Sequence, residues 1–100
     1  MKNILLVCNA GMSTSVLVKK MQKVAEEKGV DATIWATSEA EIENEWRKAD
    51  VILLGPQIRF LKGDIEKIVD GKVNVEAIDF MTYGAMNGEK VLELALSLIK

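Results

Sequence analysis

The chain contains no histidine and a single cysteine, Cys8, among its 100 residues. Without histidine it cannot hold a Ser-His or Cys-His catalytic pair, a histidine-ligated metal or a phosphohistidine of its own. With one cysteine it can form neither an intrachain disulfide nor a Cys-x-x-Cys redox or zinc motif. A lone thiol near the start, with no signal peptide before it, indicates a reducing cytoplasm.

The sequence also lacks an excess of one charge and any long apolar run. Its 13 basic and 15 acidic residues give a formal net charge of -2. This balance provides no basic field for nucleic acid and no polybasic patch for an anionic membrane. The apolar run after Met1–Asn3 is too short for a secretory signal or a membrane span. We therefore expect a cytoplasmic chain that reaches a membrane only through a partner.

What is present is the pattern of one α/β domain over residues 1–100, with 49% apolar residues to form its core. Short apolar strands alternate with helices of amphipathic spacing. The predicted strands are Ile4–Cys8, Asp31–Thr37, Val51–Leu54 and Val73–Ile78. Helices are predicted over Ser13–Lys28, over Phe60–Val69 with an interruption at Gly63, and over Gly88–Ile99. A short acidic helix, capped by Ser38, is predicted between the second and third strands, with Ile42, Trp46 and Ala49 on its inner face. The segment Asp79–Asn87 is predicted to be a loop.

Alternation over such short connections predicts a parallel sheet with right-handed crossovers. The most apolar strands, the first and third, belong in the centre, which gives a small open four-stranded sheet of order 2-1-3-4 with helices on both faces. This arrangement is flavodoxin-like and also that of the cysteine phosphatases. Such sheets place their site beyond the carboxyl ends of the strands, between strands 1 and 3. Cys8 ends the first of these strands, and Gly55-Pro56-Gln57 follows the third.

Cys8 is therefore expected in a turn that leads into the first helix. The unpaired N–H groups and the dipole of a helix N-terminus favour a thiolate, and they also bind a phosphoryl group attached to the sulfur. Three hydroxyl groups, of Ser13, Thr14 and Ser15, add hydrogen bonds to an oxyanion or cap the helix. The plain alternative is a small apolar residue at the end of a strand.

Familiar phosphate-binding loops do not fit this segment. The sequence has no GxxxxGK[ST] and no GxGxxG motif. A phosphatase loop of the type Cys-x5-Arg would need arginine where Thr14 stands. A guanidinium there would stabilise the transferring phosphoryl group, so a loop without it holds a phosphoryl group but is poorly built to hydrolyse its ester.

Two segments of the chain carry a family resemblance. Val7–Ser15 and Gly55–Arg59, supported by Thr82–Gly84, closely resemble the cytoplasmic B component (EIIB) of the lactose/cellobiose/chitobiose family of sugar phosphotransferase systems. The resemblance runs over the whole chain. It implies a phosphotransferase component that takes a phosphoryl group from a phosphohistidine of the A component and passes it to a sugar in the membrane-embedded C component.

The same resemblance implies the site residues. Cys8 is the expected phosphocysteine, and the phosphate-binding loop consists of Asn9, Ala10, Gly11, Met12, Ser13, Thr14 and Ser15. No cofactor and no metal are expected. The sugar is a β-linked disaccharide such as cellobiose, chitobiose or lactose, and the C component selects it.

Four residues outside the loop are candidates for contact with the phosphoryl group or a partner: Pro56, Gln57, Arg59 and Tyr83. Each also has a plain structural alternative. The Pro56 turn and Gln57 can simply begin the third helix, Arg59 can be a solvated arginine, and Tyr83 can be a packing residue. Met12 is expected to be exposed at the same edge, where a flexible methionine suits a docking surface.

Two further functions compete with the carrier. A small cysteine-dependent phosphatase or reductase would turn over an aryl phosphate, against which Thr14 in the arginine position argues. A flavodoxin-like binding module would bind a cofactor such as flavin and would not need Cys8. Only 5% of the residues are aromatic, which leaves few side chains to stack on an isoalloxazine ring.

Overall fold

The computed structural model describes residues 2–8 and 11–99 of the chain, with side chains in the second range from Thr14 onward. Four parallel strands form one sheet in the order β2-β1-β3-β4, which confirms the predicted order. The strands are β1 (Lys2–Val7), β2 (Ala32–Thr37), β3 (Val51–Leu54) and β4 (Asn74–Ala77). Val7 pairs with Thr37 of β2 and with Leu54 of β3, so these three strands end level with one another.

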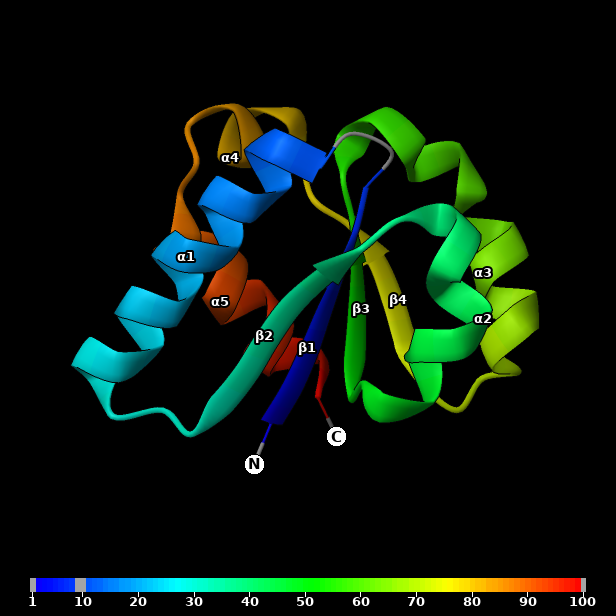
Figure 1. Cartoon of the computed structure of the whole chain (residues 1–100), viewed down its shortest axis with the longest axis horizontal. Helices are drawn as coiled ribbons and strands as arrows, with labels where there is room; N and C mark the ends of the chain where they lie inside the picture. Colours follow the sequence, from blue (N-terminus) through cyan, green and yellow to red (C-terminus); the bar gives the residue numbers. More distant parts are fainter. Residues whose placement is uncertain (1, 9–10, 100) are drawn as a thin grey trace.

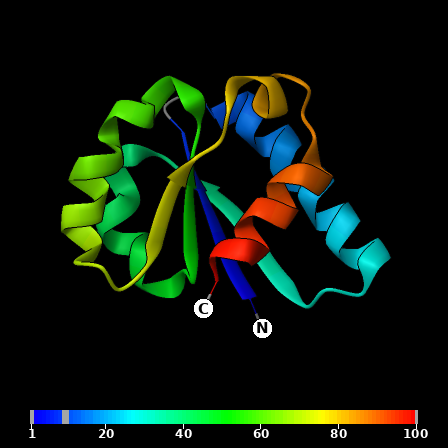
Figure 2. The same ribbon diagram turned by 180° about the vertical axis from the view of Figure 1, so that it is seen from behind.

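Helices cover both faces of the sheet, as predicted (Figures 1 and 2). On one face lie α1 (Gly11–Lys28) and α5 (Gly88–Leu98), whose bounds differ little from the predicted ones. On the other face lie α2 (Ile42–Glu45) and α3 (Lys62–Val69). The start of β1 and the end of α5 lie near each other at the amino edge of the sheet, opposite the edge where β1 ends.

Alternate residues of the central strands supply the two halves of the core. Ile4 and Leu6 of β1 face Leu17 and Met21 of α1, together with the inner face of α5. Leu5 and Val7 face the opposite cluster, which includes Trp46 and Ile65. Every residue of β3 is 0% exposed. Continuous burial on both faces explains why these strands are unbroken apolar runs rather than alternating ones.

The second helical segment is less regular than predicted. Its inward residues Ile42, Trp46 and Ala49 are buried as expected. However, the segment consists of a 3-10 turn η1 (Glu39–Glu41), the single turn α2, and a second 3-10 turn η2 (Trp46–Lys48). Ser38 precedes it with extended backbone and makes no side-chain cap, so the predicted capping role is wrong. Tightening into 3-10 turns satisfies the ends of so short a helix without a cap.

The predicted interruption at Gly63 is also wrong. Helix α3 runs through Gly63, and the irregular part precedes it as a 3-10 segment η3 (Pro56–Leu61). The break lies at Ile58, where φ is -118° and ψ is 22°. Ile58 is 1% exposed, so the backbone leaves helical geometry at the residue that turns its side chain into the core.

The segment Asp79–Asn87, predicted as a loop, contains a short helix α4 (Phe80–Gly84). Asp79 caps it, since its carboxylate accepts a hydrogen bond from the Thr82 N–H at 3.1 Å. This is the ordinary role of aspartate at an N-cap, and it stabilises a helix too short to form by propensity alone. Figure 1 shows α4 next to the beginning of α1, at the carboxyl edge of the sheet.

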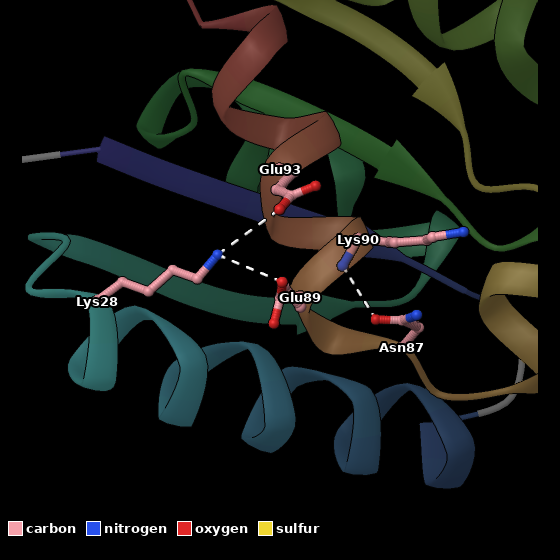
Figure 3. A network of polar contacts seen from close by, with 5 residues as sticks. All are labelled: Lys28, Asn87, Glu89, Lys90 and Glu93. Atoms are coloured by element: carbon pink, nitrogen blue, oxygen red, sulfur yellow. Dashed lines mark hydrogen bonds and ion pairs between the residues drawn. The ribbon is translucent and has the colours of Figure 1, made fainter.

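The first turns of α5 lie against α1 (Figure 3). The Asn87 side chain caps it by accepting a hydrogen bond from the Lys90 N–H at 3.1 Å. Lys28 Nζ, at the end of α1, lies 3.6 Å from a carboxylate oxygen of both Glu89 and Glu93. These groups are exposed, so the ion pairs contribute little to stability. The close contact is at Gly88, where an added Cβ would lie 2.9 Å from the Lys20 carbonyl carbon.

Gly88→Ala should therefore destabilise the fold, because the new methyl group would meet the backbone of α1. We expect a loss of about 1–3 kcal/mol, the usual range for overpacking. Gly63→Ala is the matched control, since an added Cβ at Gly63 meets nothing within 4 Å and alanine favours a helix. Urea unfolding of both variants tests this, and equal stability of Gly88→Ala and the wild type would contradict it.

Candidate functional site

Cys8 lies where the sequence predicted, directly after β1 at the carboxyl edge. Its N–H donates to the Thr37 carbonyl at 3.2 Å, and the Gly55 N–H donates to the Val7 carbonyl at 2.9 Å. These bonds continue the ladder past the last paired residues and hold the ends of β1 and β3 together. Cys8 itself is 4% exposed.

Gly55 and Gln57 lie beside the sulfur. A Cβ built on Gly55 would be 3.4 Å from Cys8 Sγ and 3.1 Å from Gln57 Oε1. The sulfur and the Gln57 amide therefore both lie next to the Gly55 Cα atom. Cys8 and the segment that begins at Gly55 therefore meet at the carboxyl ends of β1 and β3, and the absence of a side chain at Gly55 provides the space.

Tyr83 of α4 contacts the same sulfur, and Thr14 of α1 contacts the Tyr83 hydroxyl. The Tyr83 hydroxyl lies 3.7 Å from Cys8 Sγ and 3.1 Å from Thr14 Oγ1, and either atom of each pair can donate. Thr14 is 2% exposed and Tyr83 is 5% exposed. The residue in the phosphatase-arginine position is thus a buried hydroxyl that bonds to a tyrosine.

The other predicted residues fall into three groups. Asn9 and Ala10 lie outside the described residues, as do the side chains of Gly11, Met12 and Ser13, whose backbone begins α1. Ser15 is exposed and Pro56 is buried. Arg59 is exposed, and its guanidinium carbon lies 5.3 Å from the centroid of the Phe80 ring. Arg59 thus makes a cation–π contact with α4 at the carboxyl edge.

Large hydrophobic side chains are exposed on the segments that follow the carboxyl ends of β1, β3 and β4. They come from the first turns of α1, from η3 and from α4: Val16 is 47% exposed, Phe60 75%, Phe80 56% and Met81 85%. Exposed apolar side chains on segments that flank a reactive group are typical of a protein-binding surface.

No local pattern predicts the contact between Thr14 and Tyr83. The sequence assigns Thr14 to an oxyanion contact or to a cap of α1, and it predicts a loop around Tyr83. A local signal for α4 does exist, because Asp79 stands at an N-cap position ahead of Phe80. Nothing in the sequence, however, specifies that such a short helix turns its tyrosine toward Cys8.

The capping of α4 by Asp79 depends on pH. Hydrogen bonds from the Thr82 hydroxyl and then from its backbone N–H hold the pKa of the Asp79 carboxyl below its usual range. The carboxylate is the form that accepts both bonds, so α4 is best capped when Asp79 is ionised.

Over residues 2–8 and 11–99 the chain shows neither a metal-binding cluster nor a membrane-spanning helix. No three His, Cys, Asp or Glu side chains there lie close enough to hold a metal ion. None of the described helices is long and apolar enough to span a bilayer.

Comparison with known proteins identifies one family. Residues 3–94 match the family described as PTS system, Lactose/Cellobiose specific IIB subunit. The oligo-beta-mannoside-specific EIIB component of Bacillus subtilis is 48% identical, over 99% of this chain and 97% of that protein. The galactose-specific EIIB component of Lactococcus lactis is 47% identical, over 98% of this chain and 96% of that protein.

A solved structure agrees with these sequence matches. The cellobiose-specific phosphotransferase IIB component from Borrelia burgdorferi superimposes with a TM-score of 0.82 at 47% identity. The match covers 98% of this chain and 91% of that one. The sheet order and the helices on both faces are therefore those of a known relative.

The Asp79 cap gives a pH-dependent prediction. A carboxyl whose pKa is lowered by folding contributes stability above its unfolded pKa of about 4, and loses it as the pH falls through the still lower folded value. Asp79→Ala should therefore be less stable than the wild type at neutral pH, and the difference should shrink as the pH falls below about 4. Urea unfolding of both proteins across this range provides the measurement, and a difference independent of pH would contradict it.

Proposed function

Since the chain belongs to the lactose/cellobiose-specific IIB family of the phosphotransferase system, we propose that it is a phosphoryl carrier in sugar uptake with Cys8 as its acceptor. The observation that carries the proposal is the position of Cys8. The only cysteine of a chain without histidine stands at the carboxyl edge, between the end of β1 and the start of α1. Since these 100 residues contain no histidine, the phosphohistidine donor lies outside them, and we propose that it is the A component.

In the loading step, the Cys8 thiolate attacks phosphorus of the phosphohistidine in line. The nitrogen–phosphorus bond breaks, its electron pair stays on the imidazole, and a sulfur–phosphorus bond forms. Helix α1 begins at Gly11, three residues after Cys8, and its first N–H groups lack partners within the helix. These donors and the helix dipole suit both the thiolate and the phosphoryl group.

In the unloading step, a hydroxyl oxygen of the sugar in the membrane C component attacks the same phosphorus. The sulfur–phosphorus bond breaks and the thiolate leaves with its electron pair, while the hydroxyl proton passes to a base of the C component or to water. The sugar is proposed to be a β-linked disaccharide. The relatives' names, which include oligo-beta-mannoside, galactose and cellobiose, indicate that this family serves several sugars.

A carrier must hold the phosphoryl group without losing it to water. An arginine in the position of Thr14 would stabilise the transition state of hydrolysis, whereas the Thr14 hydroxyl is neutral and bonded to Tyr83. This difference supports the carrier over a cysteine-dependent phosphatase.

The A and C components are proposed to dock in turn on the edge surface, formed by Val16, Phe60, Phe80 and Met81. The Arg59 guanidinium on Phe80 adds one positive charge to it. A carrier has to leave each partner quickly, so a modest and partly apolar contact suits this role. The chain would then work in the cytoplasm, where both partners present their reacting groups.

The acceptor is tested by intact mass after incubation with a phosphorylated A component. We expect one added phosphoryl group on the wild type and none on Cys8→Ser, because serine at this position lacks the readily ionised sulfur. The unloaded proteins serve as mass references. A wild type that stays unmodified by several such donors would sink the proposal, and turnover of an aryl phosphate would favour the phosphatase.

The edge surface is tested with Met81→Gln, which keeps the length of the side chain but makes it polar. We expect a several-fold rise in the A-component concentration needed for half-maximal loading, since interface residues of this kind contribute on the order of 1 kcal/mol. Lys72→Gln, in the turn before β4 at the opposite edge, is the control. Unchanged loading of Met81→Gln would show that docking occurs elsewhere.

A further inference from the structure

The Tyr83 hydroxyl is in direct contact with the Cys8 sulfur and, on its other side, with the Thr14 hydroxyl. Tyr83 Oη lies 3.7 Å from Sγ, within hydrogen-bonding reach of the large sulfur atom, and 3.1 Å from Thr14 Oγ1. The three residues come from the end of β1, from the first turns of α1 and from α4. All are buried, so water screens these contacts little.

We propose that Tyr83 is a further catalytic residue, whose hydroxyl donates a hydrogen bond to the Cys8 sulfur whenever that sulfur is negatively charged, and that Thr14 is the positioning residue that orients this hydroxyl. This assignment rests on the proposed carrier function for its role in transfer. The hydrogen bond itself belongs to the unmodified protein.

The direction of the two hydrogen bonds follows from the charge of the sulfur. A thiolate has no proton and only accepts, so Tyr83 O–H must donate to it, and Thr14 O–H then donates to the Tyr83 oxygen. A thiol has a proton to donate, and both hydroxyl groups are then able to reverse. The pair therefore adapts to either state of the sulfur without moving a heavy atom.

The effect on transfer is greatest where the sulfur gains charge. As the sulfur–phosphorus bond breaks toward the sugar, the electron pair returns to Sγ, and the Tyr83 hydrogen bond stabilises the leaving thiolate. During loading the same bond increases the thiolate fraction but weakens each thiolate as a nucleophile, so the two effects partly cancel. Removing the bond should slow unloading more than loading.

Hydrogen bonds within and around α4 hold Tyr83 in place. Tyr83 is held there because Asp79 caps the helix and the Tyr83 N–H donates to the Asp79 carbonyl at 3.0 Å. The Met86 N–H in turn donates to the Tyr83 carbonyl at 3.0 Å. The backbone on both sides of Tyr83 is thus fixed, and its hydroxyl is directed at Cys8 rather than at solvent.

The test is the pH titration of Cys8 in the unmodified protein, followed by the rate at which iodoacetamide alkylates the thiol. The alkylated residue is unambiguous because the chain has one cysteine, and Tyr83 does not contribute to this signal. Tyr83→Phe removes the oxygen alone and should raise the pKa of the Cys8 thiol by about one unit, since a hydrogen bond to a charged group is worth roughly that much. Thr14→Val should raise the pKa less.

Two further variants separate this role from plain packing. The double variant Tyr83→Phe with Thr14→Val should titrate like Tyr83→Phe alone, because Thr14 acts through Tyr83. Ser97→Ala removes a hydroxyl that donates to the Leu94 carbonyl in α5, away from the site, and should leave the titration unchanged. If the Cys8 thiol of Tyr83→Phe has the same pKa as in the wild type, the proposal is overturned. If Tyr83→Phe does not fold, an unchanged Cys8 pKa in Thr14→Val overturns it instead.

Transfer kinetics provide the second readout. In Tyr83→Phe, release of the phosphoryl group from phosphocysteine to the sugar should slow about tenfold, the fold-change that matches one pKa unit. If the Cys8 titration of Tyr83→Phe differs from that of the wild type, but the wild type never accepts a phosphoryl group, the hydrogen bond stands and the carrier function is overturned. If the two titrations are the same and the wild type is loaded normally, the carrier function stands and the role of Tyr83 is overturned.

Discussion

The close pairing of β1 and β3 at their buried carboxyl ends is the constraint on which the site depends. Because β1 and β3 are covered on both faces, their side chains leave no freedom to shift register, and Val7 and Gly55 are joined by a backbone hydrogen bond of 2.9 Å. This places the sulfur of Cys8 beside a residue without a side chain. The helices that follow each strand then converge on the same edge, which brings Thr14 and Tyr83 to the sulfur.

The site obtains its polarity from neutral groups. Thr14 occupies the position that an arginine would fill in a phosphatase loop, and its hydroxyl is hydrogen-bonded to Tyr83. Hydroxyl and N–H donors bind an anion without strongly stabilising the extra charge of a hydrolytic transition state. In this account, retention of the phosphoryl group and its ready release to a docked partner have the same physical origin.

Much of this arrangement could be predicted from the sequence, because the features that determine it are local or periodic. The apolar runs of β1 and β3 specified the strand order, and the order specified that Cys8 and Gly55 meet. Three features were not predicted from the sequence: the irregular backbone at Ile58, the missing cap at Ser38 and the helix α4. Each depends on which side chain the core accepts, or on a few hydrogen bonds in a short segment, and such contacts leave no periodic pattern. The hydrogen bond between Thr14 and Tyr83 joins residues 69 positions apart and escaped for the same reason.

The central claim is that this chain keeps a phosphoryl group until a partner takes it. Its most direct test follows the fate of a labelled phosphoryl group on the loaded chain, first alone and then with membranes that contain the C component and a β-linked disaccharide. The account predicts that the label stays on the protein in the first case and appears on the sugar in the second. Release as inorganic phosphate at the same rate in both cases would contradict it, because the site would then be a hydrolase.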